Sequence, residues 1–277
     1  MNTAAEVTVF AQDAASTAWL RSGGHVHVVR RMDAELLRSA GSFLVLALAS
    51  RLPEIAEFVT AANHRHRLKG LLVLLDNAAM ATWLPQMLDR ANLRTLRNCL
   101  SHHGAVLPRR VVEAWRVGAQ DDLLADVTVS NETLFALTCA MDRIEVPMAS
   151  IPALKRLSPA QRQHFEVAAD GNYVYWPDGD VHLDVDALRV VVDPGHRATA
   201  MVEHARHLLD LGQRVRAVRV AHGVRKASVN GVSDRQLRRI ESGEFFPRVE
   251  TLTKLAEAHG LGLSDYLNEI ANVATSI

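Results

Sequence analysis

The sequence predicts a multi-domain α+β protein with an N-terminal helical bundle, a small central α+β domain and a C-terminal domain of five helices. Three observations support this division. Residues 33–118 carry long apolar faces, residues 123–192 alternate short β-type runs with turn residues, and residues 214–270 contain capped helices that end at glycines. We therefore expect domains at residues 1–120, 123–195 and 201–277.

The apolar residues of the N-terminal region predict helices throughout. Phe43–Leu48 is followed by a second apolar face at Ile55–Val59, and Pro53 is expected to restart a helix between them. Arg67–Leu75 is expected to start another helix, and Gln86–Leu100 is expected to form a third. Pro108–Trp115 is expected to form the short last helix of the bundle. This pattern predicts an all-helical domain.

The helix expected to end near Leu100 carries Arg97, Asn98 and His102. This spacing resembles the R-x4-6-H motif of HEPN (higher eukaryotes and prokaryotes nucleotide-binding) proteins, many of which are RNA-cleaving toxins built as helical bundles. The resemblance implies that His102 moves a proton at a ribose 2′-hydroxyl while Arg97 steadies the phosphate charge. Residues five apart on one helix point about 140° from each other, so the site requires the helix to end at Gly104 or a second subunit to contribute. The alternative is a solvated arginine and a histidine near the negative end of a helix dipole.

The middle region contains short strands and one clear helix start. Strands are expected at 126–129, 133–138 and 143–147, and a helix is expected after the cap Ser158 with Pro159 at its first position. The stretches at 144–147, 152–154 and 158–162, together with Tyr-Trp-Pro at 175–177 and the run 182–188, resemble the bacterial family known as domain of unknown function 2442. Some members carry a helix-turn-helix after this domain, and the resemblance therefore implies a regulatory or antitoxin-like protein.

No metal or other cofactor is expected. Five side chains that could bind a metal alternate along one segment: Asp178, Asp180, His182, Asp184 and Asp186. A calcium loop starting at Asp178 would need Gly and Glu where the chain has Leu183 and Arg189. An acidic turn leading into an Asp-capped helix explains the same residues. A zinc site is not expected either, because nothing brings the remaining candidate ligands together: His64, His66, His102 and His103.

The C-terminal segment contains a short helix with two defined ends. Ser233 and Gln236 form an S-x-x-Q capping box at its start, and Gly243 is placed to end it. Leu237 and Ile240 share the face expected to pack on the domain. The outward side therefore carries the polar residues Asp234, Arg235, Arg238 and Arg239.

The residues around this helix extend the pattern over about 60 positions. They include Arg-Val-Arg at 214–216, Gly-Val-Ser at 231–233, Ile-Glu-Ser-Gly-Glu at 240–244 and Leu-Thr-Lys-Leu-Ala at 252–256. Together they resemble the lambda-repressor-like (XRE-type) helix-turn-helix family. The resemblance implies a five-helix domain whose third helix, starting at Ser233, enters the major groove of DNA. The family's second helix usually begins Thr-Gln-Glu-Glu, whereas this chain has His-Gly-Val-Arg at 222–225. We therefore expect Arg225 or Lys226 to replace the missing glutamine, or the second helix to be short.

This resemblance also implies which side chains touch DNA. Contacts to base edges are expected from the exposed positions of the third helix, namely Asp234, Arg235, Gln236, Arg238 and Arg239. Contacts to phosphates are expected from Arg214, Arg225, Lys226, Ser233 and Arg248. The stretch from 206 to 254 holds 11 Lys and Arg against 5 Asp and Glu, while the whole chain holds 31 of each class. A basic segment in a neutral chain is typical of phosphate binding.

Composition excludes several other classes. Cys99 and Cys139 are the only cysteines, which excludes a disulfide framework or a cysteine zinc finger and indicates a reducing cytoplasm. The best apolar run, Phe43–Ala49, is far too short to span a membrane. Aromatic residues make up 5% of the chain, which argues against a stacking platform for single strands.

From these observations we expect a cytoplasmic bacterial transcription regulator that binds double-stranded DNA as a homodimer, and not an enzyme. Two alternatives stay open. One is a HEPN-like ribonuclease or toxin–antitoxin component acting through Arg97, Asn98 and His102. The other is an antitoxin or scaffold whose main partner is a toxin-like protein.

Overall fold

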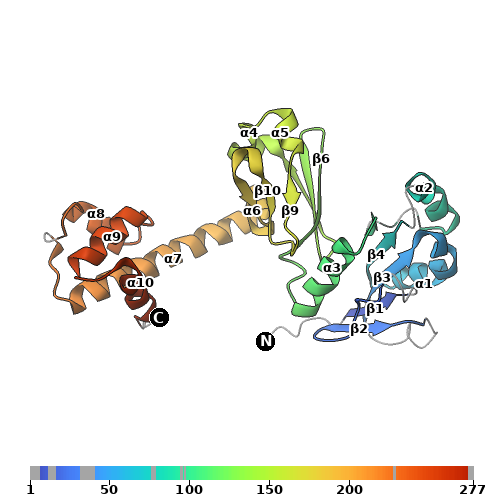
Figure 1. Cartoon of the computed structure of the whole chain (residues 1–277), viewed down its shortest axis with the longest axis horizontal. Coiled ribbons are helices and arrows are strands. Elements are labelled where there is room, and N and C mark those ends of the chain that lie inside the picture. The colour runs from blue at the N-terminus through green and yellow to red at the C-terminus, as the bar shows by residue number, and fades with distance from the viewer. Residues whose placement is uncertain are drawn as a thin grey trace. The chain divides into compact units, whose positions relative to one another are not determined.

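The computed structural model describes residues 7–11, 17–31, 41–75, 79–93, 96, 98–226 and 229–273. The chain divides into two compact units, Met1–Val192 and Asp193–Ile277. Figure 1 shows the helices and strands of both units.

The first unit begins with a five-stranded parallel sheet in the order β2-β1-β3-β4-β5. Its strands are β1 (Val7–Ala11), β2 (Val26–Val29), β3 (Ser42–Leu48), β4 (Leu68–Leu74) and β5 (Cys99–His102). The order 2-1-3-4-5 is that of a doubly wound, flavodoxin-like α/β fold. The expected N-terminal helical bundle is therefore wrong.

The burial of β3 explains this error. Phe43 and Val45 pack with α1 (Leu52–His64) on one face of the sheet, while Leu44 and Leu46 pack with α3 (Val106–Val117) on the other. A parallel strand buried on both faces has a continuous apolar run, which periodicity cannot distinguish from a buried helix. The helix expected to begin at Arg67–Leu75 is β4 for the same reason.

Helices cover both faces of the sheet. One face is covered by α1 (Leu52–His64), preceded by the 3-10 turn η1 (Ala49–Arg51), and by α2 (Met80–Arg90); the other is covered by α3 (Val106–Val117). Pro53 lies in the first turn of α1, as expected, because its missing N–H costs nothing there. The helix expected from Gln86 to Leu100 ends at Arg90, and the chain re-enters the sheet at Cys99 as β5.

The rest of the first unit is a small α+β region, as the sequence predicts. Two three-stranded antiparallel sheets have the orders β6-β7-β8 and β11-β10-β9. Their elements are β6 (Leu124–Ser130), β7 (Thr133–Thr138), β8 (Arg143–Pro147), η2 (Met148–Ser150), α4 (Pro152–Lys155), α5 (Pro159–Gln163), β9 (Glu166–Val167), β10 (Val174–Trp176), η3 (Pro177–Gly179), β11 (Val181–Leu183) and α6 (Val185–Val192). Trp176 is fully buried in the common core, and its Nε1 donates to the carbonyl of Arg162 at 3.0 Å.

The second unit contains α7 (Pro194–Ala221), α8 (Asp234–Glu241), α9 (Val249–Ala258) and α10 (Leu263–Asn272). Their shared core includes Val215, Leu237, Leu255 and Tyr266. The sequence predicts five helices here, but no α-helix lies between α7 and α8 among the described residues, where Lys226 alone has 3-10 helical geometry. Ala227 and Ser228, which lie in this segment, are outside the described residues.

Among the described residues, no helix combines the length and apolar character needed to cross a bilayer.

Candidate nucleic-acid interface

The helix α8 has the ends that the sequence predicts. The hydroxyl of Ser233 accepts from the backbone N–H of Gln236 at 3.2 Å. Gly243 follows the helix with φ 73°, a left-handed conformation that a side chain would strain. Only one half of the expected capping box forms, because the Gln236 side chain does not bond back to the backbone of Ser233. That amide is left with no hydrogen-bond partner among the described residues.

Two glycines let α8 cross α7 at close range. A Cβ on Gly212 would lie 2.4 Å from the carbonyl oxygen of Ile240, and one on Gly243 would lie 2.6 Å from Cα of Leu209. Both contacts are with backbone, which cannot turn aside. The glycines therefore determine how closely α8 packs on α7, and with it which face of α8 is exposed.

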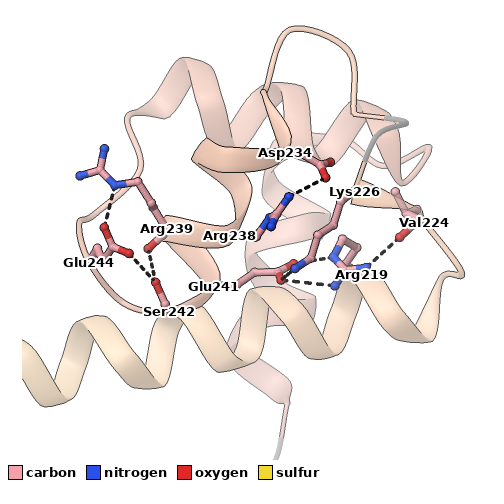
Figure 2. Close-up of polar contacts among 9 residues, drawn as sticks. All are labelled: Arg219, Val224, Lys226, Asp234, Arg238, Arg239, Glu241, Ser242 and Glu244. Carbon is pink, nitrogen blue, oxygen red and sulfur yellow. Dashed lines mark hydrogen bonds and ion pairs between the residues drawn. The ribbon is translucent and has the colours of Figure 1, made fainter.

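A buried ion pair holds the same crossing (Figure 2). Arg219 on α7 pairs with Glu241 at the end of α8, and their side chains are only 11% and 5% exposed. The Arg219 guanidinium also donates to the carbonyl of Val224 at 3.0 Å, and Nζ of Lys226 lies 3.2 Å from Oε2 of Glu241. The carboxylate thus fastens both α7 and the following segment to α8.

The outer face of α8 carries three exposed arginines, Arg235, Arg238 and Arg239, opposite the buried Leu237 and Ile240. Two of them have carboxylate partners: Arg238 bonds Asp234 at 3.3 Å and Arg239 bonds Glu244 at 2.7 Å. No ion pair of Arg235 occurs among the described residues. Arg235 is therefore the side chain on this face best able to reach a new partner.

A polar depression of about 510 Å³ lies beside this face. Gln236 and Arg239 on α8, Arg248 before α9, and Lys254 on α9 contribute to its lining. Glu250 also lines it, and Glu244 pairs with Arg239 near it. The hydrogen bond from Arg239 lowers the pKa of Glu244, so this carboxylate stays charged at neutral pH. The three cationic side chains that line this depression, Arg239, Arg248 and Lys254, are suited to bind a phosphate.

The predicted base-reading residues differ in availability. Arg235, Arg238 and Arg239 are exposed, whereas Asp234 and Gln236 are half-buried. One oxygen of Asp234 accepts from Arg238, and its Oδ1 is buried with no hydrogen-bond partner among the described residues. Asp234 is thus placed to orient Arg238 more readily than to meet a base.

The predicted phosphate-binding residues differ in exposure and in the contacts they already make. Arg248 and Arg225 are exposed, and the hydroxyl of Ser233 serves as the cap of α8. Lys226 is directed to Glu241. Arg214 bonds Asp210 at 2.8 Å and the carbonyl of Ala271 at 2.9 Å, so it ties α7 to the end of α10.

Sequence reasoning missed Lys254 and Glu244. The local signal for Lys254 is its exposed position on α9 opposite the buried Leu252 and Leu255. Its place beside Gly231, where a Cβ would lie 3.2 Å from Nζ, follows only from the packing of α9 near α8.

The residues predicted for the ribonuclease alternative belong to the first unit, at and near β5. Arg97 is outside the described residues. The Asn98 amide donates to the carbonyls of Leu68 and Lys69 at 2.9 and 3.0 Å, where β5 enters the sheet. His102 is at the other end of β5, four residues or about 13 Å along the strand. Asn98 and His102 therefore do not converge on one site.

The alternating acidic segment has a structural role in part. Asp184 caps α6 by accepting from the N–H of Ala187 at 2.7 Å, and Asp178 bonds Nδ1 of His164 at 2.8 Å. In the described part of the chain, no three His, Cys, Asp or Glu side chains are grouped to hold a metal ion.

Comparison with known proteins identifies only the middle region. Residues 125–190 match a family described as a protein of unknown function (DUF2442), which confirms the resemblance expected for this region. No curated protein and no solved structure matches the chain.

Proposed function

We propose that this chain is a sequence-specific DNA-binding transcription regulator that inserts α8 into the major groove. The observation that carries the proposal is the outer face of α8, where three arginines are exposed beside a hollow bordered by Arg248 and Lys254. A short helix with an apolar inner face and a basic outer face suits this groove. Arg235 would read a base, and Arg248 and Lys254 would hold phosphates.

Exposed apolar residues on α7 support a homodimer. Its buried residues lie at Gly212–Arg219, whereas Met201 and Val202 are 67% and 69% exposed and Leu209 is 46% exposed. Such a stripe suits a second helix. A dimer would place two copies of α8 on paired half-sites, and the DNA complex should then contain two chains per site.

The test is a titration of the full chain against its own upstream region and a scrambled duplex of equal length. We expect Arg235→Ala to remove about 1–3 kcal/mol of the discrimination between the two duplexes. Arg248→Ala should weaken binding to both duplexes by the same factor and reduce the slope of log K against log salt by about 1. Arg216→Ala, which removes an exposed arginine from α7, is the matched control and should change neither.

Equal losses on both duplexes for Arg235→Ala would contradict base reading by this residue. Equal binding of the unmodified chain to both duplexes, lost by physiological salt, would overturn the proposal. The exposed stripe of α7 would then favour the alternative of a protein partner.

A further inference from the structure

The parallel sheet of the first unit has a cavity at the edge where its strands end. About 340 Å³ in volume, it is lined by Leu48 at the end of β3, Leu75 after β4, His102 at the end of β5 and Thr17 after β1. The strand order reverses between β1 and β3, both of which reach this edge. Crevices outside the carboxyl ends of such sheets, at the point of reversal, are where doubly wound folds bind ligands.

The lining is mainly apolar. Leu46, Leu48, Leu74 and Pro108 contribute to the walls, together with the ring of Trp19. The Arg109 guanidinium stacks on that ring at 5.3 Å and holds it in place. No Asp, Glu, Lys or Arg of the described residues lines the cavity. The lining also includes the exposed His103, so among the described residues an anion would find at most this one imidazole as an ionic partner and a cation would find none.

His102 is the polar group with the best-defined role in the lining. Its side chain is buried, and its Nδ1 lies 2.6 Å from the carbonyl oxygen of Gly104. A carbonyl only accepts, so Nδ1 carries the proton and Nε2 of the neutral ring presents a lone pair. Burial lowers the pKa of His102 below its usual value, which keeps the ring neutral at physiological pH.

Thr17 is fixed at the opposite side of this edge. The Arg30 guanidinium donates to the hydroxyl and, at 3.1 Å, to the carbonyl of Thr17, and it also donates to the carbonyl of Ala11 at the end of β1, at 3.2 Å. The cavity thus has a wall anchored to β1 as well as one at β5.

We propose that this cavity binds a small, largely apolar molecule that donates one hydrogen bond, from a hydroxyl or a ring N–H, to Nε2 of His102. The volume lies in the range of small-molecule sites, which are mostly apolar with a few placed polar groups. A cavity of about 150 Å³ holds benzene, so this one has room for a fused two-ring compound. The proposal does not depend on DNA binding by the second unit.

The test compares two probes of nearly equal shape, indole and benzofuran, on the full chain. Indole has a ring N–H where benzofuran has an oxygen, so only indole donates to His102. Binding is followed by calorimetry and by the amide resonances of cavity residues. We expect saturable binding of indole and at least about tenfold weaker binding of benzofuran, since bound benzofuran would cover Nε2 of His102 without donating a hydrogen bond to it.

Two variants locate the effect. His102→Asn retains a donor for the carbonyl of Gly104, but its shorter side chain places no acceptor at the position of Nε2, so it should abolish the preference for indole. His64→Asn makes the same change at an exposed site on α1 and should leave the preference intact. If His102→Asn does not fold, the two probes on the unmodified chain still decide the matter. Saturation by neither probe, or equal affinity for both, would overturn the proposal.

Discussion

Arginine–carboxylate pairs occur both where α8 packs on α7 and on the outer face of α8, but the two pairs differ in burial. Arg219 and Glu241 lie at the inner crossing, where their side chains are 11% and 5% exposed. Arg239 and Glu244 lie on the outside, where theirs are 50% and 52% exposed. Water screens the outer pair, so exchanging its carboxylate for a phosphate costs little. The inner pair has no such substitute, and breaking it leaves a charge buried. Stability and the proposed DNA binding would therefore depend on different residues of similar chemistry.

The largest expected effect comes from breaking the inner pair. Arg219→Met leaves the buried Glu241 with Lys226 alone and should cost about 3–5 kcal/mol of the stability of the second unit. Hydrogen exchange of the α8 and α10 amides in the full chain measures this loss. Arg216→Met is the control, because Arg216 is exposed on the same helix, and it should change stability by less than about 0.5 kcal/mol. Similar exchange in the two variants would show that the buried pair does not hold the crossing.

A smaller effect is expected from the cap of α8, and it separates stability from phosphate binding at one position. Ser233→Ala removes the bond to the N–H of Gln236 and should cost about 1 kcal/mol, measured by the same exchange. Ser233→Asp preserves the cap and suits the positive end of the helix, but it places a negative charge at the proposed DNA-binding face. This variant should retain the stability of the second unit while weakening its binding to all duplexes by the same factor. Unchanged DNA binding in Ser233→Asp would remove Ser233 from the phosphate-binding residues.

The cap of α5 is a useful internal reference for that experiment. Ser158 accepts from Gln161 at 3.3 Å, and the Gln161 side chain accepts from the N–H of Ser158 at 2.9 Å, so both halves of the box form. In α8 only the serine half forms. In the S-x-x-Q sequence of α5 the Gln161 side chain thus completes the cap, whereas in the same sequence of α8 the Gln236 side chain lines the polar depression.

These contrasts explain how far the sequence alone can predict the structure. Caps and glycine stops act over four or five residues, so Ser158, Ser233 and Gly243 could be placed correctly from sequence. The sheet could not, because its strands are buried on both faces and have no alternation.

The candidate interface shows the same limit. The exposed side of α8 follows from the spacing of Leu237 and Ile240. The structural role of Arg214 follows only from the end of α10, 56 and 57 residues further along the chain. Helical spacing puts Arg219 on the face of Val215 and Val218, but only the packing of α8 brings Glu241 to it, so the buried ion pair is likewise a tertiary property.

The smallest expected effect concerns the outer pair. Glu244→Gln removes the charge that holds Arg239 and leaves this arginine available to a phosphate. Because the bond from Arg239 lowers the pKa of Glu244, mild acidification leaves the carboxylate charged, and substitution is the cleaner way to remove it. We expect slightly tighter binding to all duplexes and a slope of log K against log salt steeper by about 0.9, one further phosphate contact. Glu203→Gln makes the same change in net charge on the exposed part of α7 and should leave the slope unchanged. An equal change of slope in both variants would attribute the effect to net charge, and an unchanged slope in Glu244→Gln would exclude Arg239 from the phosphate contacts.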